Sequence, residues 1–425
     1  MRAMKDSGVE WIGDIPAEWK IIRLKYVAHW NINTLPENTL EDTLIKYIDI
    51  SSVSYDNGII QIQELNFSDA PSRARRVLTT GDTIISTVRT YLKAIAYIIP
   101  KYNNYICSTG FAVYTPNPEI LGKYLYYSLC AHYFISMIEA YSVGISYPAI
   151  NSSTLSNLNI VFAPYEKQHR IADYLDDRCS KIDTLIAQEQ TVIEKLKEYR
   201  QSMITQAVTK GLDPDVPMKN SGVEWIGKIP ADWDIRKIKY LFKLRNERNY
   251  LPLETINLLS LYTDIGVFPH GEQEERGNKA VSADGYKKVY KNDIVVNIIL
   301  AWMGAIGISN YNGVTSPAYD IYMPLSSMVC SKYFNYLFRT KGFAGECYKY
   351  GRGIMAMRWR TYSNEFLNIL VPVPTFSMQI IITEHLDSRC SAIDATISKK
   401  QTLIDKLTEY KKSLIYEVVT GKKEV

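Results

Sequence analysis

The chain of 425 residues contains one long internal repeat. The segment SGVEWIG begins at Ser7 and begins again at Ser221, an offset of 221 − 7 = 214 residues. Near the far end of each half, residues 175–199 match residues 386–410 with an offset of 386 − 175 = 211 residues. A repeat of this length exceeds the roughly 20 to 50 residues of a solenoid unit. It indicates two copies of a domain, each followed by a connector.

The interiors between the duplicated ends differ, apart from weak echoes such as TTGDTIIS at 79–86 and YKNDIVVN at 290–297. Short β-branched and aromatic runs bounded by Gly, Pro and Asn predict strands in both interiors. Segments such as 122–138 predict amphipathic helices. Each half is therefore expected to form a mixed α and β globule of ordinary domain size. A duplication whose symmetry has no present use remains an open alternative.

The duplicated far ends predict two long helices, because neither residues 166–209 nor residues 377–420 contain Pro or Gly. Apolar residues recur there at intervals of three, four and seven, which is typical of a coiled-coil seam. The predicted seam residues are Ile182, Ile186, Ile193, Leu196, Met203, Ile393, Ile397, Ile404, Leu407 and Leu414. A pseudo-two-fold axis between the halves would make the two helices antiparallel. Helices that pack only on their own globules are the alternative, since amphipathic stripes are common.

The predicted fold class is therefore α+β, with two mixed α/β domains joined by two long helices and related by a pseudo-two-fold internal repeat. The first domain is expected over residues 1–165 and the first long helix over 166–210. The second domain is expected over residues 211–376 and the second long helix over 377–425.

Composition excludes several classes of protein. No apolar run approaches the roughly 18 to 20 residues of a spanning helix, and the first residues lack the apolar core of a signal peptide, so we expect a cytoplasmic protein. The six cysteines form no C-x-x-C pair and the five histidines no H-E-x-x-H motif, so no metal site is expected. A net charge of +4 permits nucleic-acid binding only through local basic patches.

Motifs for catalysis are also missing. The chain has no phosphate-binding loop, no dinucleotide fingerprint and no nucleophile elbow. It also lacks the Asp/Asn-Pro-Pro-aromatic motif on which an adenine methyltransferase holds its flipped base. We therefore expect no enzymatic activity in this chain, and an enzyme with an unfamiliar site is a weaker alternative.

Clusters of basic residues occur in both interiors. Those of the first half are Arg73, Arg75, Arg76, Arg89 and Lys93, and those of the second are Lys243, Arg245, Arg248, Arg352, Arg358 and Arg360. Arginine forks read guanine edges and clamp phosphates, so these residues are predicted to bind DNA. A solvated surface patch explains any one cluster equally well. Their recurrence in both halves favours DNA.

The order of these elements resembles the specificity subunit of type I restriction-modification systems, over nearly the whole chain. The resemblance is carried by SGVEWIG-x-IP-x-x-W, by APYEKQHRIADYLD at 163–176 and by the link TKGLDPDVPMKNSGVEWIG at 209–227, after which the order repeats. It implies two target-recognition domains, each reading one part of a split, asymmetric DNA target. It also implies two antiparallel conserved helices that hold the domains apart.

The resemblance further implies partners. Two modification (methyltransferase) subunits would dock on the long helices, and restriction (endonuclease/translocase) subunits would complete a defence complex. S-adenosylmethionine, ATP and magnesium are expected on those partner subunits, and no cofactor on this chain. A coiled-coil scaffold whose two heads bind proteins rather than DNA is the alternative function.

Two further sets of residues follow from the repeat. Trp11, Trp19, Trp225 and Trp233 occupy repeated positions and are predicted to dock the partner subunits, although core anchoring is the alternative for residues of this type. The segments SVGISYPAI at 142–150 and GRGIMAMRW at 351–359 come late in each interior. Similar segments lie close to DNA in the family that the chain resembles.

Overall fold

The computed structural model contains two compact units. Unit 1 comprises Met1–Gln190 and Gln401–Val425, and unit 2 comprises Thr191–Lys400. The residues that the structure describes are 2–263, 265–270, 282–353 and 359–425. Each unit therefore contains one of the two interiors and a part of each long helix, and the predicted mixture of helices and strands is confirmed.

The main sheet of unit 1 has four antiparallel strands in the order β11-β10-β13-β4. The strands are β4 (Ala28–Trp30), β10 (Thr83–Ser86), β11 (Ile95–Tyr97) and β13 (Phe111–Pro116). Every residue of β10 is buried, as expected for a short β-branched run inside a sheet. Helix α1 (Gly122–Cys130) packs against this sheet and leads into α2 (His132–Tyr141). Their aromatic residues Tyr124, Tyr133 and Phe134 are buried in the core of the unit.

A second sheet in unit 1 has the order β8-β5-β12-β9. Its strands are β5 (Leu44–Ile48), β8 (Gln63–Asn66), β9 (Ala74–Val77) and β12 (Ile106–Ser108). β12 runs parallel to β5 and antiparallel to β9. The other strands of the unit form short antiparallel pairs: β1 (Met4–Asp6) with β2 (Asp14–Pro16), β3 (Lys20–Arg23) with β14 (Asn159–Phe162), and β6 (Val53–Ser54) with β7 (Gly58–Ile59).

Unit 2 repeats this topology. Its main sheet, read in the same direction, has the order β23-β22-β25-β18. The strands are β18 (Phe242–Leu244), β22 (Ile294–Asn297), β23 (Ile306–Ile308) and β25 (Tyr319–Pro324). α5 (Ser331–Phe338), α6 (Lys341–Tyr350) and α7 (Ser363–Asn368) follow in the places that α1, α2 and α3 (Ser152–Ser156) take in unit 1.

The second sheet is the part in which the units differ most. In unit 2, β19 (Leu259–Tyr262) pairs with β20 (Gly266–Pro269), and β21 (Lys287–Val289) pairs with β24 (Gly313–Thr315). An isolated parallel bridge between Leu258 and Val314 stands where unit 1 has the β5–β12 ladder. The two interiors therefore share the main sheet and its helices, and they differ mostly in the second sheet and its loops.

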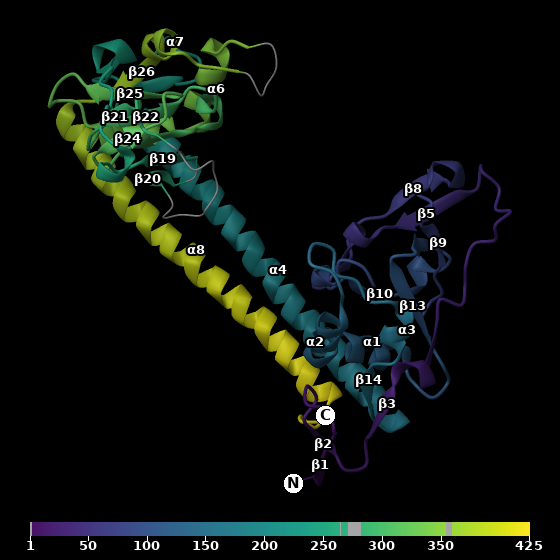
Figure 1. Cartoon of the computed structure of the whole chain (residues 1–425). Helices are drawn as coiled ribbons and strands as arrows, with labels where there is room; N and C mark the ends of the chain where they lie inside the picture. Colours follow the sequence, from purple (N-terminus) through teal and green to yellow (C-terminus); the bar gives the residue numbers. More distant parts are fainter. Residues whose placement is uncertain (1, 264, 271–281, 354–358) are drawn as a thin grey trace. The chain divides into compact units, whose positions relative to one another are not determined.

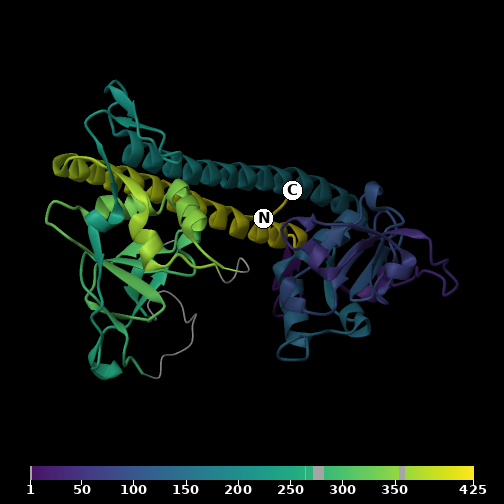
Figure 2. The ribbon, with the colours of Figure 1, turned by 90° about the horizontal axis from the view of Figure 1, so that it is seen from above.

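The two long helices are α4 (Tyr165–Lys210) and α8 (Phe376–Val419), with 46 and 44 residues. In unit 1, β14 leads into the start of α4, with β3 beside it (Figure 1). In unit 2, the strands and short helices lie along the first half of α8 (Figure 2). Both helices lie where the absence of Pro and Gly predicted them. No helix in the described residues has the length and hydropathy needed to cross a membrane.

In each unit an ion pair joins the segments of the two long helices. In unit 1 the ammonium of Lys411 lies 2.7 Å from Asp183, and in unit 2 the Nε of Arg200 lies 3.0 Å from Asp394. Lys411 and Arg200 are polar residues that interrupt the apolar pattern of the predicted seam. The two ion pairs are equivalent in the repeat: Asp183 corresponds to Asp394, since 394 − 183 = 211, and Arg200 corresponds to Lys411, since 411 − 200 = 211.

None of the ten predicted seam residues is exposed. Ile182, Ile193, Ile404 and Leu414 are buried, and the other six are half-buried. Apolar positions next to them on the same helices, such as Leu185 and Leu403, are exposed. This pattern of burial is what a helix seam requires.

The repeated opening segment packs on the end of a long helix in each unit. In unit 1, Ile12, Ile15 and Trp19 share a core with Val418 of α8, and the Tyr416 hydroxyl donates a 2.9 Å hydrogen bond to the Ile12 carbonyl. In unit 2 the equivalent residues pack against α4. They are Ile226, Ile229 and Trp233 of the segment around β15 (Met218–Asn220) and β16 (Lys228–Pro230), with Ile204 and Val208 of the helix.

This packing corrects the docking prediction for two tryptophans. Trp19 and Trp233 are 2% and 1% exposed, so their rings are core anchors and are not available to a partner. Trp11 is exposed. Trp225 is half-buried, with its ring 5.9 Å from that of Phe343. For Trp11 and Trp225 docking stays a prediction.

Candidate nucleic-acid interface

Two loops of unit 1 form one continuous edge. The first covers residues 87–93 and contains the 3₁₀ turn η4 (Thr90–Leu92), and the second is the hairpin 142–150. The amide of Ile150 donates to the carbonyl of Thr87 at 2.9 Å, and the hydroxyls of Thr90 and Ser142 lie 2.9 Å apart. We call this pair of loops the reading edge of unit 1.

The first loop of this edge is held in a strained conformation. Arg89 and Lys93, which flank the turn, have φ angles of 52° and 50° in the left-handed region. Such angles are costly for residues other than glycine and gather at functional sites. The Arg89 guanidinium lies 5.3 Å from the centre of the Tyr147 ring, and Lys93 pairs with Glu139 at 2.9 Å. The edge therefore presents two of the predicted basic residues together with aromatic side chains.

Unit 2 has the same edge at equivalent positions. The amide of Thr361 donates a hydrogen bond to the carbonyl of Ile298 at 2.9 Å. The two residues correspond to Ile150 and Thr87 of unit 1, since 361 − 150 = 211 and 298 − 87 = 211. The turn η8 (Ala301–Met303) replaces η4. Arg352 and Arg360 exchange two backbone hydrogen bonds of 2.9 Å at the base of the second loop. The reading edge of unit 2 is thus formed, among the described residues, by residues 298–304 together with Arg352 and Arg360.

The side chains on the two edges differ although the backbone frame is shared. Tyr91, Leu92 and Lys93 of unit 1 correspond to Trp302, Met303 and Gly304 of unit 2 at the same offset of 211. In unit 2 aromatic side chains also contact one another: the Tyr348 ring stacks on Trp359 at 4.9 Å and meets Trp302 edge-to-face at 5.9 Å. One backbone arrangement therefore carries two different chemical surfaces.

The arginines near β9 lie close to the reading edge of unit 1. The carbonyl of Arg73 accepts a hydrogen bond from the Thr109 amide at 2.8 Å, and the next residue, Gly110, accepts one from the Thr87 amide at 2.8 Å. Arg75 packs over the ring of Phe67 at 4.7 Å. Arg76 is half-buried, and burial lowers the pKa of its guanidinium. Of these three arginines, Arg73 is the exposed one.

In the second unit the predicted basic residues are spread over several places. Arg245 is engaged internally: its side chain is 12% exposed and its guanidinium makes bonds of 2.9 and 3.1 Å to the carboxylate of Asp293. DNA binding by Arg245 would break this pair, so it is the weakest of the predicted contacts. Lys243 and Arg248 are exposed, and the guanidinium of Arg248 donates to the Gly285 carbonyl at 3.0 Å.

Arg352 and Arg360 lie on the reading edge of unit 2. The side chain of Arg352 is 77% exposed and 3.2 Å from Glu365, and Arg360 is exposed. Arg358 lies outside the residues that the structure describes. The sequence grouped Lys243, Arg245 and Arg248 with these residues as one interface, and the structure provides no contact that brings the two groups together within the described residues.

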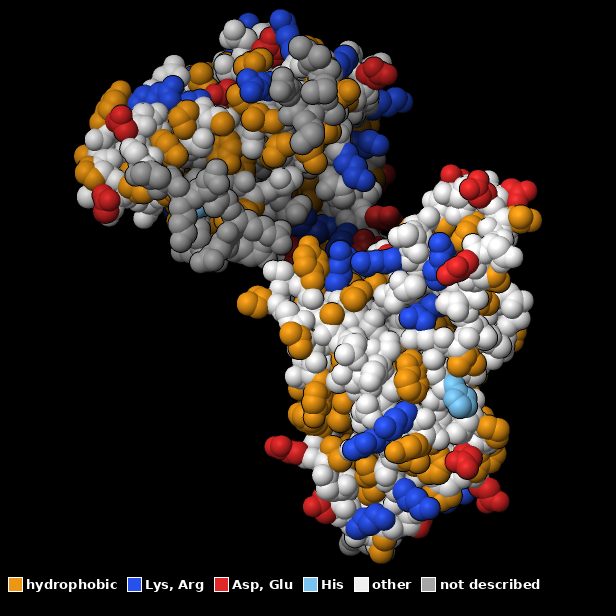
Figure 3. All heavy atoms as spheres, turned by 45° about the vertical axis from the view of Figure 1, so that its right-hand side comes forward, with side chains coloured by type: hydrophobic (Ala, Val, Ile, Leu, Met, Phe, Trp, Pro, Cys, Tyr) orange, Lys and Arg blue, Asp and Glu red, His pale blue; other side chains and the backbone are white. Residues whose placement is uncertain are grey.

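Lys and Arg side chains do not form one continuous patch on the face of unit 1 that Figure 3 shows. On the face in Figure 3 they lie in several separate groups among apolar and uncharged side chains. This distribution fits the small net charge of +4. Binding by this unit must therefore combine a few charges with contacts of another kind.

The weak echo between TTGD and YKND in the sequence is explained by a shared turn. The carboxylates of Asp82 and Asp293 accept hydrogen bonds from the amides of Thr79 and Tyr290, at 2.7 and 2.9 Å. Burial raises the pKa of both carboxyls. These turns lead into β10 and β22, from which the reading edges begin, so both aspartates position the edge in their own unit.

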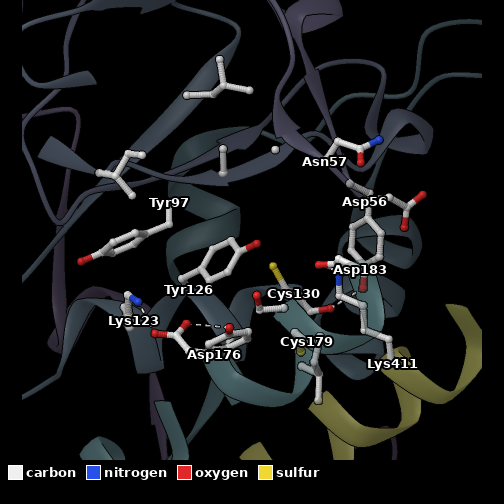
Figure 4. Close-up of a pocket in the computed structure, with 18 of the residues that line it drawn as sticks. Asp56, Asn57, Tyr97, Lys123, Tyr126, Cys130, Asp176, Cys179, Asp183 and Lys411 are labelled. Atoms are coloured by element: carbon white, nitrogen blue, oxygen red, sulfur yellow. Dashed lines mark hydrogen bonds and ion pairs between the residues drawn. The ribbon is translucent and has the colours of Figure 1, made fainter. Parts of the chain in front are cut away.

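A cavity of about 680 Å³ lies in unit 1 between α1, α4, α8 and the β6–β7 hairpin. Lys123 and Asp176 point toward each other there, beside Tyr97 and Tyr126 (Figure 4). The Tyr127 hydroxyl donates to Asp176 at 2.8 Å, and in unit 2 Tyr336 donates to Asp387 at the same distance. Because this contact occurs in both units, we assign it to the shared frame, where it fastens the first helix of each interior to a long helix.

Two thiols line this cavity, but they are poor nucleophiles. Burial raises the pKa of Cys130 to about 12 and that of Cys179 to about 11, so both are uncharged at neutral pH. In the described residues no group of three or more His, Cys, Asp or Glu side chains is placed to hold a metal ion.

Sequence reasoning missed the apolar residues of the reading edge. Val143, Ile145 and Tyr147 are 80%, 101% and 68% exposed at the tip of the hairpin. The segment itself was singled out in the sequence for its similarity to segments that lie close to DNA, but no role was predicted for its apolar residues. The Gly144 and Pro148 that bound the tip were the signal available for a turn.

The chain thus has a duplicated α+β frame, two long helices and two loop edges that share a backbone arrangement. Residues 16–195 match the family model described as the type I restriction modification DNA specificity domain. A specificity subunit of the type I restriction enzyme MjaVIII from Methanocaldococcus jannaschii is 25% identical over 317 residues, which are 70% of this chain and 69% of that protein. The EcoBI specificity subunit from Escherichia coli is 27% identical over 228 residues, 48% of this chain and 47% of that one.

Solved structures share the fold. A chain from a study of complex assembly and conformational transition of the type I restriction-modification system superposes with a TM-score of 0.73 and 18% identity, covering 95% of this chain and 98% of that one. The HsdS subunit from Thermoanaerobacter tengcongensis gives a TM-score of 0.53 at 20% identity, covering 96% and 98%. The chain is therefore similar in sequence to type I restriction-modification specificity subunits, and it shares its fold with a solved one.

Proposed function

We propose that the chain is the non-catalytic subunit that selects the DNA sequence on which a type I restriction-modification complex acts. The observation that carries the proposal is the duplicated reading edge: the same backbone hydrogen bond, 87 to 150 and 298 to 361, supports different side chains in the two units. A protein that reads two different half-sites needs this combination of one frame and two surfaces. Each unit accordingly reads one half of a bipartite, asymmetric target.

The two long helices form an antiparallel coiled coil in this proposal, and its length sets the gap between the half-sites. The interhelical ion pairs support the antiparallel register, because their positions have the same sum in each unit, 183 + 411 = 594 and 200 + 394 = 594. Residues that pack on each other in an antiparallel pair keep such a sum constant. The untouched DNA between the half-sites therefore has a fixed length.

The partners belong to the same proposal. Two modification subunits dock on the shared frame, one for each repeat, and restriction subunits join the complex. S-adenosylmethionine, ATP and magnesium are held by these partners, and the complex works in the cytoplasm. Docking uses surfaces that the repeat presents twice, such as those around the exposed Trp11 and the half-buried Trp225.

A scaffold that binds proteins through both heads is not favoured by the similarity to type I specificity subunits. Salt dependence distinguishes the two functions. Binding to duplex DNA weakens steeply as salt rises, because neutralised phosphates release counterions.

The test is co-expression with the neighbouring modification subunit in a methylation-free host, followed by genome-wide mapping of methylated adenines by single-molecule sequencing. One split, asymmetric motif with a fixed gap supports the proposal, and exchange of either interior should then change one half-site only. No new methylation from a complex that is shown to be assembled would overturn it.

A further inference from the structure

We propose that the tip of the hairpin 142–150 enters the base stack of duplex DNA as an apolar wedge at the half-site of unit 1. The inference rests on the proposed function and assigns a mode of contact to the same reading edge. The observation behind it is the exposure of three neighbouring apolar residues, Val143, Ile145 and Tyr147, of which Ile145 is 101% exposed. Large apolar side chains gathered at one projecting point mark a binding site.

The hairpin is held firmly enough to act as a wedge. Val143 and Ala149 exchange two backbone hydrogen bonds of 2.9 and 3.0 Å, and Ala149 also bridges to Val88. The turn begins at Gly144, whose φ of +112° is open to glycine and strained for other residues. A β-carbon at this position would meet the carbonyl oxygen of Tyr147 at 3.1 Å. The paired backbone of Val143 and Ala149 therefore holds Ile145 at the projecting tip of the hairpin.

The charges around the tip favour DNA over a protein as its partner. Residues 87–93 and 142–150 contain no Asp or Glu, and they carry Arg89 and Lys93. Arg89 packs over the Tyr147 ring at 5.3 Å, which places a cation beside the apolar tip. Lys93 is paired with Glu139 of α2, whereas the guanidinium of Arg89 lies against the aromatic ring of the tip.

Architectural DNA-binding proteins combine these two elements. Their Arg and Lys side chains hold the phosphates while an apolar side chain enters between two base pairs and partly unstacks them. Pyrimidine–purine steps unstack most easily. We therefore expect the wedge to act at such a step, and to contribute specificity through the ease of unstacking rather than through a hydrogen bond to a base.

The experiment uses the assembled complex with its modification subunit and a duplex carrying the target found by methylation mapping. 2-Aminopurine is placed in turn at each position of the duplex, because its fluorescence rises when stacking is lost. Wild-type complex should raise the fluorescence at one step within one half-site. Ile145→Ser should abolish the rise and weaken binding roughly 10-fold, with an unchanged salt slope, because no charge is removed.

Two variants serve as controls. Leu40→Ser removes another apolar residue of unit 1 that is 71% exposed, and it should change neither fluorescence nor affinity. Ile145→Met keeps an apolar side chain and should retain the fluorescence rise.

The outcomes separate the wedge from the proposed function. Salt-dependent binding of the wild-type complex without any fluorescence rise overturns the wedge and leaves the DNA-reading function in place. Failure of the wild-type complex to bind any duplex overturns the function itself. A third outcome is that Ile145→Ser prevents assembly, although the wild-type complex assembles, binds and unstacks DNA normally. The tip then contacts protein, and the wedge is wrong.

Discussion

The amide of Ile150 donates a hydrogen bond of 2.9 Å to the carbonyl oxygen of Thr87, and it ties together two loops that are 150 − 87 = 63 residues apart in the chain. The bond between Thr361 and Ile298 does the same in unit 2 over 361 − 298 = 63 residues. Both bonds use backbone atoms only. These two bonds therefore hold the loops of each edge together without fixing which side chains residues 87, 150, 298 and 361 carry.

Removal of a charge from one edge should affect one half-site. Arg352→Ala should weaken binding by about 1–3 kcal/mol at the half-site of unit 2 and leave the other unchanged, since its exposed guanidinium serves one edge. Arg73→Ala is the matching change in unit 1 and should affect the opposite half-site. Competition binding with duplexes mutated in either half measures the effect. Equal losses at both half-sites from Arg352→Ala would contradict the assignment of one half-site to each unit.

A buried charge in the helix seam should destabilise the protein. Ile404→Asp places a carboxylate at a position that is 8% exposed and should cost about 3–5 kcal/mol of the free energy of unfolding. Leu403→Asp changes the adjacent residue on the same helix, which is 43% exposed, and should cost less than about 1 kcal/mol. Urea denaturation followed by circular dichroism distinguishes them. Similar losses from the two variants would show that the seam does not run through Ile404.

The repeated tryptophans should divide by burial rather than by their place in the repeat. Trp19→Ala and Trp233→Ala should each cost about 3–5 kcal/mol, because each removes a large ring from a closed core. Trp11→Ala removes a ring that is 42% exposed and should leave the free energy of unfolding within about 1 kcal/mol. Urea denaturation gives all three values. If Trp11 docks a partner, the same variant should weaken assembly with the modification subunit, as measured by size-exclusion chromatography.

The cysteines should react with a thiol reagent in a fixed order. Burial raises the pKa of Cys130 to about 12 and of Cys179 to about 11, so at pH 8 the reactive thiolate form is rare at both. Cys330 is the one cysteine of the six that is not buried. At pH 8 the native protein should therefore release one equivalent of thionitrobenzoate quickly from Ellman's reagent, and six after denaturation. Cys330→Ser should remove the fast phase, and a fast phase that persists in this variant would show that another thiol is accessible.

The long helices and the shared frame were predictable from sequence because their signals are local. The absence of Pro and Gly over 166–209 and the spacing of residues such as Ile182 and Ile193 depend only on neighbours in the chain. The duplication itself predicted that both interiors have one fold. Strand pairing, in contrast, was out of reach: β5 and β12 lie side by side in parallel although their paired residues Tyr47 and Ile106 are 106 − 47 = 59 positions apart in the chain.

The site was predicted less well because residue type does not reveal what a side chain touches. Arg245 is of a residue type that often contacts DNA, but in the folded unit its guanidinium is hydrogen-bonded to Asp293. Ile145 is of a residue type that is usually buried in a core, but a turn that begins at Gly144 places it in solvent. Trp19 and Trp11 are eight residues apart in the same repeated motif, and one is buried while the other is exposed. In each case the deciding contact comes from another part of the chain.

The repeated SGVEWIG segments seat the ends of the long helices and lie outside both reading edges. Stretches of a gene that encode nearly identical segments are natural sites of genetic recombination. A crossover within the stretches that encode residues 7–13 and 221–227, or within those for 175–199 and 386–410, would replace one interior as a block and keep its helix contacts intact. Evolution can therefore acquire a new half-site in one event, with no intermediate that has to refold.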